Sequence, residues 1–459
     1  MKKFLKGFID IPKEDHKKVL YFFLLGAFWA FGISICDTVA SSLFLKNIGA
    51  ESLPINYLVI AICSFGFAYL FLKKLKQIHP SKIFLFFLIL VSSIITLLSF
   101  ALLFHSSFRL ILYITPIITF LFDAMLIATY WTFIDKYHDL QDAKNFYCVY
   151  NGAYFMGYIG SAITISKFYP IVGPSGLFLF AVVLFIGAMF ICKQIIQYIP
   201  SIEETHIDGI FQSRKTKLTS WFSLLLKSPF TLCLVFLSLI IQLIRMTTEF
   251  SYMSTFEHSL YEKFEHLSSA QIESFIATFI SKWKAYIAVA NITLGIFLYK
   301  KAIKRIGITT MLLIPPLAFV SLYSSWIHVN TLIIAICALI CIECILYSIE
   351  DNNFNVLMNA APTALQGSVR IINDSLFEPL GMLISSIFLF TIQSHAKMIG
   401  LILSIIALLF VLMLRIFYHN SIYKNLNDHH ISFNDQLKTF LKKLSKKETN
   451  EIYQDLYKA

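Results

Sequence analysis

Residues 18–46 read KVLYFFLLGAFWAFGISICDTVASSLFLK, and this stretch decides the fold class. Between its flanking lysines it holds a single charged residue, Asp37. An apolar run of about twenty residues is long enough to cross the hydrocarbon core of a bilayer as an α-helix. The run is too long for a signal peptide and lacks a small-residue cleavage site, so we expect it to remain in the protein as a transmembrane helix.

The remainder of the chain repeats this pattern. Of its 459 residues 57% are hydrophobic and only 14% are charged, whereas soluble domains carry about 25% charged residues. This composition excludes an ordinary soluble, disordered or disulfide-stapled protein. It predicts an all-α, polytopic membrane protein with twelve transmembrane helices in two six-helix halves. The predicted spans are 18–46, 53–72, 82–104, 109–135, 146–168, 173–192, 229–255, 277–298, 307–326, 330–352, 369–393 and 397–418.

The basic residues sort between the two sides of the membrane. Of the 38 lysines and arginines, 30 lie on the side shared by both tails and the middle loop, 7 lie on the other side, and Arg245 lies within a span. Such a bias marks the cytoplasmic side, so we expect both termini to be cytoplasmic, in a bacterial inner membrane. The expected parts are an N-tail (1–17), a first bundle (18–192), a middle loop (193–228), a second bundle (229–418) and a basic tail (419–459).

The basic tail holds one further pattern. Ser432 and Asp435 have capping-box spacing, and apolar residues then recur at helical spacing opposite several lysines. This predicts either a short amphipathic helix on the inner leaflet or a solvated helix. The net charge of +11 comes from loops and tails, so a nucleic-acid partner is not expected.

Charged residues inside the spans are the candidate site. A charge at mid-bilayer costs about 2.5–3.5 kcal/mol on insertion scales, so it usually faces the bundle interior, a partner or a watery path. The candidate substrate or coupling residues are Asp37, Asp123, Arg245, Glu249, Glu343, Arg370, Asp374 and Glu378.

Two interpretations of these charges remain open. Arg245 and Glu249 have i,i+4 spacing, as do Arg370, Asp374 and Glu378, so each set could neutralise itself on one helix. Asp37, Asp123 and Glu343 have no basic residue within a turn, so each needs a hydrogen bond to another helix, an ion, a proton or a substrate. The first and fourth spans of both halves hold an acid, a weak internal repeat of the kind seen in transporters.

Small residues and missing motifs complete the pattern. Gly152, Gly157, Gly160 and Ser161 keep the fifth span slim, which favours close helix packing. No metalloprotease, nucleophile-elbow or phosphate-loop motif occurs. We therefore expect neither an enzyme nor a metal or cofactor site.

Several stretches resemble the bacterial and plastid ADP/ATP translocase (nucleotide transporter) family. They are Asp37 with Ile48-Gly49-Ala50-Glu51-Ser52, Trp131-Thr132-Phe133 with Asp142-Ala143-Lys144-Asn145-Phe146-Tyr147, Glu249 with Trp283, and Tyr347-Ser348 with Asp351 and Asn355. The resemblance spreads over roughly positions 30–400. It implies a twelve-helix transporter of the major-facilitator type.

The charges that this resemblance implies are only partly present. Glu249 matches the acid of the family's seventh helix, and the fourth-helix acid falls at Thr119, one turn before Asp123. Cys36 and Phe354 stand where the family has lysines, so we expect ATP/ADP exchange to be weak or absent. Residues 370–381 look more like a side branch of uncharacterised relatives.

The sequence therefore predicts a secondary transporter that works by alternating access. The resemblance makes a nucleotide or a phosphorylated metabolite the first-choice substrate. The alternatives are a proton- or cation-coupled carrier of a less charged solute, or a membrane sensor or lipid-handling protein that does not transport.

Overall fold

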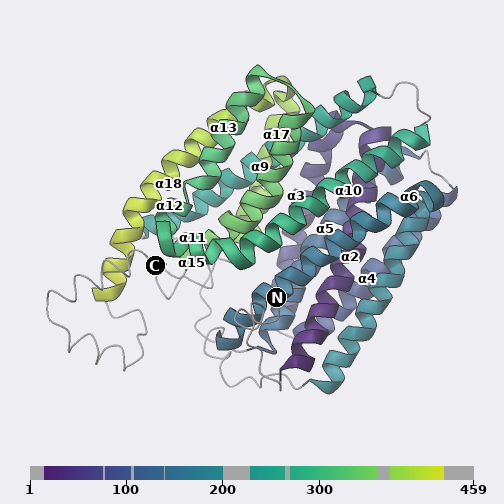
Figure 1. Cartoon of the computed structure of the whole chain (residues 1–459), viewed down its shortest axis with the longest axis horizontal. Coiled ribbons are helices and arrows are strands. Elements are labelled where there is room, and N and C mark those ends of the chain that lie inside the picture. Colours follow the sequence, from purple (N-terminus) through teal and green to yellow (C-terminus); the bar gives the residue numbers. More distant parts are fainter. Residues whose placement is uncertain are drawn as a thin grey trace. The chain divides into compact units, whose positions relative to one another are not determined.

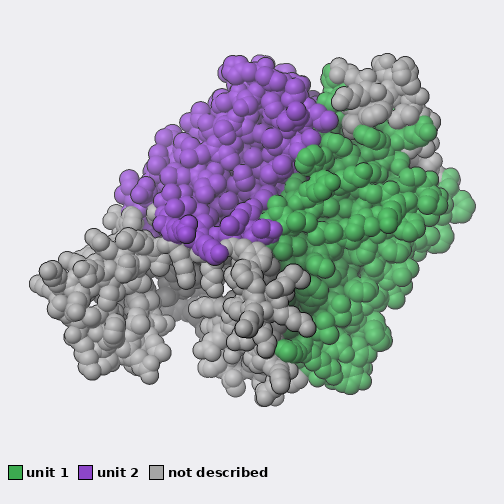
Figure 2. Space-filling model, viewed as in Figure 1, with its two compact units in different colours: residues 1–211, 256–292 green, residues 212–255, 293–459 purple. Residues whose placement is uncertain are grey.

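The structure is a computed structural model that describes residues 15–75, 78–104, 108–138, 140–199, 228–263, 269–358 and 373–427. Every element in these ranges is a helix (Figure 1), which confirms the all-α prediction. The chain forms two compact units (Figure 2): unit 1 comprises Met1–Phe211 and Phe256–Ile292, and unit 2 comprises Gln212–Thr255 and Thr293–Ala459.

Unit 1 is built from long α-helices. Its elements are α2 (His16–Asn47), η1 (Ala50–Ser52), α3 (Leu53–Leu75), α4 (Pro80–Phe104), α5 (Arg109–Asp135), α6 (Leu140–Tyr198) and α10 (Ser269–Thr293). Within α6 the backbone breaks at Gly173 (φ 65°, ψ −173°), which lies near Pro170 and Pro174. A positive φ favours glycine, and this break falls where the sequence predicts a boundary between two spans.

Unit 2 mixes α-helices with wider π-helical segments. The α-helices are α9 (Pro229–Lys263, whose last residues belong to unit 1), α11 (Tyr299–Ile306), α12 (Ile308–Met311), α13 (Ile314–His328), α14 (Leu332–Ile340), α15 (Asp351–Met358), α17 (Glu378–Thr391) and α18 (Ala396–Asn427). The π-helical segments are η2 (Leu294–Leu298), η3 (Cys341–Glu350) and η4 (Asn373–Phe377), and η5 (Gln393–His395) is a 3₁₀ turn. The spans predicted at 330–352 and 369–393 are thus not uniform α-helices.

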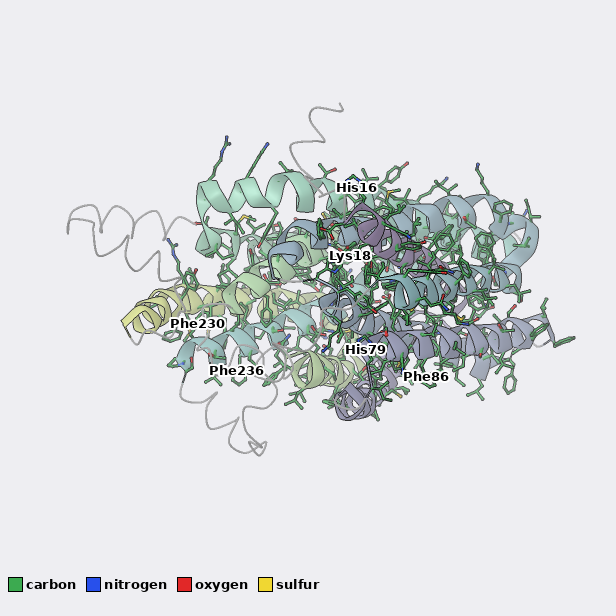
Figure 3. All side chains as sticks on the ribbon, turned by 90° about the horizontal axis from the view of Figure 1, so that it is seen from below. His16, Lys18, His79, Phe86, Phe230 and Phe236 are labelled. Carbon is green, nitrogen blue, oxygen red and sulfur yellow. The ribbon has the colours of Figure 1, made fainter. Side chains whose placement is uncertain are left out.

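Eight helices in the described part of the chain are long and apolar enough to cross a membrane. They are His16–Asn47, Ala50–Phe67, Pro80–Phe104, Arg109–Ile134, Val149–Tyr198, Pro229–Ser259, Leu332–Phe354 and Gln393–Tyr418. Large apolar side chains are exposed on both units, among them Phe86 and Phe236 (Figure 3). The chain is a multi-pass membrane protein, and the count of twelve spans stays a prediction.

The core of unit 1 surrounds α2, which packs most extensively against α6. A Cβ atom on Gly157 would lie 2.6 Å from the backbone nitrogen of Phe31, and one on Gly160 would lie 3.2 Å from the Phe31 ring. Gly152 has no atom within 4 Å of such a position. The close helix packing predicted for the fifth span is therefore present at Gly157 and Gly160 but not at Gly152.

Some predictions fall outside the described residues. These are the N-tail (1–14), most of the middle loop (200–227), Arg370 and the tail helix that begins near Ser432. The part of the middle loop up to Tyr198 continues helix α6.

Candidate functional site

An ion pair inside unit 1 joins two distant parts of the sequence. The Lys284 ammonium of α10 donates to Oδ2 of Asp37 on α2 at 2.6 Å. The side chain of Lys284 is 12% exposed and that of Asp37 is 31% exposed. Hydrogen bonds between two ionised groups are about twice as strong as neutral ones. The partner that Asp37 requires is thus a cation 247 residues away.

Lys284 was not predicted to be that partner. Its position in the sequence counts it, with the neighbouring Lys282, among the seven basic residues expected on the outer membrane side. In the structure, Lys282 is exposed whereas Lys284 is half-buried on α10. A lysine seven residues inside a predicted span (277–298) was the available signal, because such a charge rarely faces lipid.

Two further hydrogen bonds join α9 to η1 and α10 to α6. The Ala50 backbone N–H donates to Oε2 of Glu257 at 2.6 Å. The Tyr169 hydroxyl donates to Oε1 of Glu273 at 2.5 Å. With the Lys284 pair, these contacts join the segment 256–292 to the other helices of unit 1. The two-bundle boundaries at 18–192 and 229–418 stay a prediction.

Gly49 accounts for the backbone conformation of residues 48–52, which belong to a stretch that resembles the nucleotide transporters. Its φ of 98° is open to glycine but strained for other residues, and an added Cβ would lie 3.0 Å from Oε1 of Glu257. The segment 48–52 therefore forms a tight turn that presents the Ala50 N–H to Glu257.

Polar side chains of unit 1 also pair within α6 and between α6 and α2. The Tyr154 and Tyr158 hydroxyls of α6 are 2.7 Å apart, and the hydroxyls of Ser34 on α2 and Ser161 on α6 are 2.6 Å apart. Asp123 lies on α5, with its Oδ1 atom buried. Of the predicted site residues, Asp37 and Asp123 are thus in unit 1.

The remaining described site residues are in unit 2. The Arg245 guanidinium of α9 lies over the ring of Tyr347, 4.6 Å from its centroid. Such a cation–π contact contributes about 0.5–2 kcal/mol, depending on how far it is desolvated. Tyr347 and Glu343 both lie on the π-helical segment η3. Glu249 is one turn after Arg245 on α9, as the sequence predicts.

The third predicted group of charges spans a change of helix type. Asp374 is in the π-helical segment η4, and Glu378 begins α17. Because Arg370 lies outside the described residues, the proposed stack of Arg370, Asp374 and Glu378 stays a prediction.

Comparisons of sequence give no relative. No family model matches the chain, and no curated protein matches it. The resemblance to ADP/ATP translocases therefore stays an expectation.

Comparisons of structure do give similar proteins. The chain is similar to a transporter of the POT family, PepTSo (10% identity, TM-score 0.57, 88% of this chain and 98% of that one). It is similar to a mutant form of the nucleoside transporter NupG (13%, 0.57, 88% and 99%). It is also similar to the xylose transporter XylE from E. coli in an inward-open conformation (11%, 0.55, 87% and 95%). At these identities the likeness shows the fold alone, which this chain shares with these three transporters.

Proposed function

We propose that this protein is a secondary transporter that moves a small solute across the membrane by alternating access. The fold shared with the three transporters supports this proposal, as do the charged residues held inside apolar helices. A nucleotide or a phosphorylated metabolite is the first-choice substrate.

The single observation that carries the proposal is the pair between Asp37 and Lys284. Replacing a buried ion pair by apolar residues is often neutral or stabilising, so stability alone does not account for two charges in this position. A substrate anion that binds Lys284 would take over the role of Asp37 as its counterion. Lys284 thereby provides a cation close to Cys36, where the resemblance to nucleotide transporters leads one to expect a lysine.

The test is counterflow in proteoliposomes loaded with unlabelled ADP. We expect labelled ADP to exchange only weakly in wild-type protein, as the residues Cys36 and Phe354 indicate, and equally in Lys282→Gln, because Lys282 is exposed on the same helix. In Lys284→Gln the exchange should fall roughly 30-fold or more, since removing one partner of a charged contact costs about 2–5 kcal/mol. Equal exchange in the two lysine variants would contradict the assignment.

A second candidate is proton-coupled transport of a less charged solute. It is favoured by the greater exposure of Asp37 relative to Lys284, 31% against 12%, which leaves the carboxylate open to a proton or a cation. A wild-type protein that accumulates amino acids or sugars only under an imposed pH gradient, and does not exchange ADP, would favour this candidate. Asp37→Asn should then abolish accumulation.

Orientation in the membrane is a separate part of the proposal. The sorting of basic residues supports cytoplasmic termini and a cytoplasmic middle loop, in a bacterial inner membrane. Reporter fusions after Lys76, Lys217 and Lys304 should all report the cytoplasm. A periplasmic signal from any one of them would contradict the proposed topology.

A further inference from the structure

Two tyrosines of α6 form a hydroxyl pair in unit 1. Tyr154 and Tyr158 are one turn apart, their ring centroids are 4.8 Å apart, and their hydroxyl oxygens are 2.7 Å apart. Both side chains are half-buried. A polar pair on a membrane helix is costly where it faces lipid, so the direction in which the pair faces matters.

The apolar residues of α6 show where the lipid lies. Met156 is 53% exposed and Ile163 is 54% exposed. Successive residues of an α-helix are about 100° apart, so both tyrosines lie at least about 140° around α6 from these two residues. The tyrosine pair therefore faces away from the lipid-exposed side of the helix.

The pair continues toward the ion pair through a second set of hydroxyls. Ser161 follows Tyr158 along α6 and meets Ser34 of α2 at 2.6 Å. Asp37, bound to Lys284, is one turn after Ser34 on α2. At 1.5 Å rise per residue, the whole polar row is about 15 Å long, and its middle is the buried Ser34–Ser161 pair.

A buried donor beside the tyrosines points to a missing hydrogen-bond partner. The Trp29 ring packs against Tyr154 at 5.4 Å between centroids, and its side chain is 1% exposed. Its Nε1–H has no acceptor among the described residues. Buried donors of this kind usually have a partner, which a water or a ligand next to Tyr154 would supply.

We propose that Tyr154 and Tyr158 bind the uncharged, hydroxyl- or ring-bearing end of an organic anion whose charged end pairs with Lys284. This inference rests on the proposed function and adds a specificity determinant to it. Each tyrosine hydroxyl can both donate and accept, which suits the hydroxyls and ring nitrogens of a nucleoside. A site built on such hydrogen bonds rejects ligands that lack the matching groups.

The experiment uses fragments of ADP as competitors of labelled ADP counterflow. Adenosine probes the uncharged end, and pyrophosphate probes the charged end. In the Tyr154→Phe/Tyr158→Phe variant, we expect adenosine to compete about tenfold more weakly, because two neutral hydrogen bonds are lost. Competition by pyrophosphate should change less than about twofold. Lys284→Gln should show the reverse pattern.

Controls separate binding from folding. Tyr286→Phe removes a hydroxyl from a tyrosine of the same unit that is 66% exposed, and it should behave like the wild type. The single variant Tyr158→Phe and the melting temperature of every variant identify losses caused by misfolding. A double variant with a wild-type melting temperature and unchanged adenosine competition would overturn the inference.

The remaining outcomes are also decisive. Equal weakening of adenosine and pyrophosphate in the tyrosine variant would overturn the assignment of the two ends, as would failure of either fragment to compete in the wild type. Absence of ADP counterflow in the wild type would overturn the nucleotide proposal together with this inference. Normal ADP counterflow with an unaffected tyrosine variant would overturn the inference alone.

Discussion

The two units hold their membrane charges in different ways. In unit 1, Asp37 sits on a long α-helix, and its partner Lys284 comes from a helix 247 residues later. In unit 2, Glu343 and Tyr347 share the π-helical segment η3, and Arg245 lies over the Tyr347 ring. The acid of the unit 1 pair thus sits on a regular α-helix, whereas Glu343 and Tyr347 of unit 2 sit on an irregular backbone.

This difference has a physical origin. A π-helical turn has i→i+5 hydrogen bonds and occurs frequently at functional sites. It rotates the following side chains relative to an α-helix, so Glu343 and Glu350 depend on the backbone for their direction. Asp37 depends instead on whether α10 stays beside α2. The two units should therefore respond differently to substitution.

The largest effect is expected at the long-range pair of unit 1. Lys284→Gln leaves Asp37 without its cation, and because the pair is only partly buried the cost should lie below the roughly 3–5 kcal/mol of a fully buried pair. Thermal unfolding in detergent should show a lower melting temperature than Lys282→Gln. The double variant with Asp37→Asn should recover the melting temperature but not ADP counterflow. Recovery of both would mean that the pair is structural.

A smaller change in stability is expected at Glu249 of unit 2. In Glu249→Gln the Arg245 guanidinium keeps its contact with the Tyr347 ring, so the protein should fold with nearly wild-type stability. Transport should collapse if Glu249 binds substrate or a coupling ion, and adding Arg245→Gln should not rescue it. A fall in melting temperature that Arg245→Gln reverses would show a structural pair instead.

Helix packing offers a matched pair of substitutions on α6. Gly157→Ala should destabilise unit 1 by about 1–3 kcal/mol, because the new methyl group would overlap the α2 backbone. Gly152→Ala meets no atom within 4 Å and should be neutral or stabilising by up to about 1 kcal/mol. Melting temperatures of the two variants, measured side by side, would test this contrast. Equal destabilisation would contradict the close approach of α2 and α6.

A modest loss of stability is expected at the cation–π contact of unit 2. Tyr347→Leu keeps an apolar side chain but removes the aromatic ring from Arg245, at a cost of about 0.5–2 kcal/mol. Tyr299→Leu, on α11, is not a suitable control because its hydroxyl donates to Asn353. Tyr347→Phe is better, since it retains the ring and should retain most of the stability. A large loss in Tyr347→Phe would show that the hydroxyl matters more than the ring.

The sequence predicts the helices better than it predicts the site. Apolar runs near 18–46 and 109–135 correspond to α2 and α5, because a membrane-crossing helix must be continuous and apolar. The partner of Asp37 could not be predicted, since a contact over 247 residues leaves no local pattern. The π-helical register of η3 was missed because an apolar run reads alike in α and π geometry.

Gly49 has a consequence for the genetics of this protein. Its backbone angle disfavours any side chain, independently of what Glu257 does. A defect caused by Gly49→Ala should therefore have no suppressor at position 257, even though Glu257 accepts a hydrogen bond from the neighbouring Ala50 N–H. Glu257→Gln, by contrast, keeps an oxygen that can accept from the Ala50 N–H. In a mutational scan, position 49 should accept glycine alone while position 257 accepts at least one alternative.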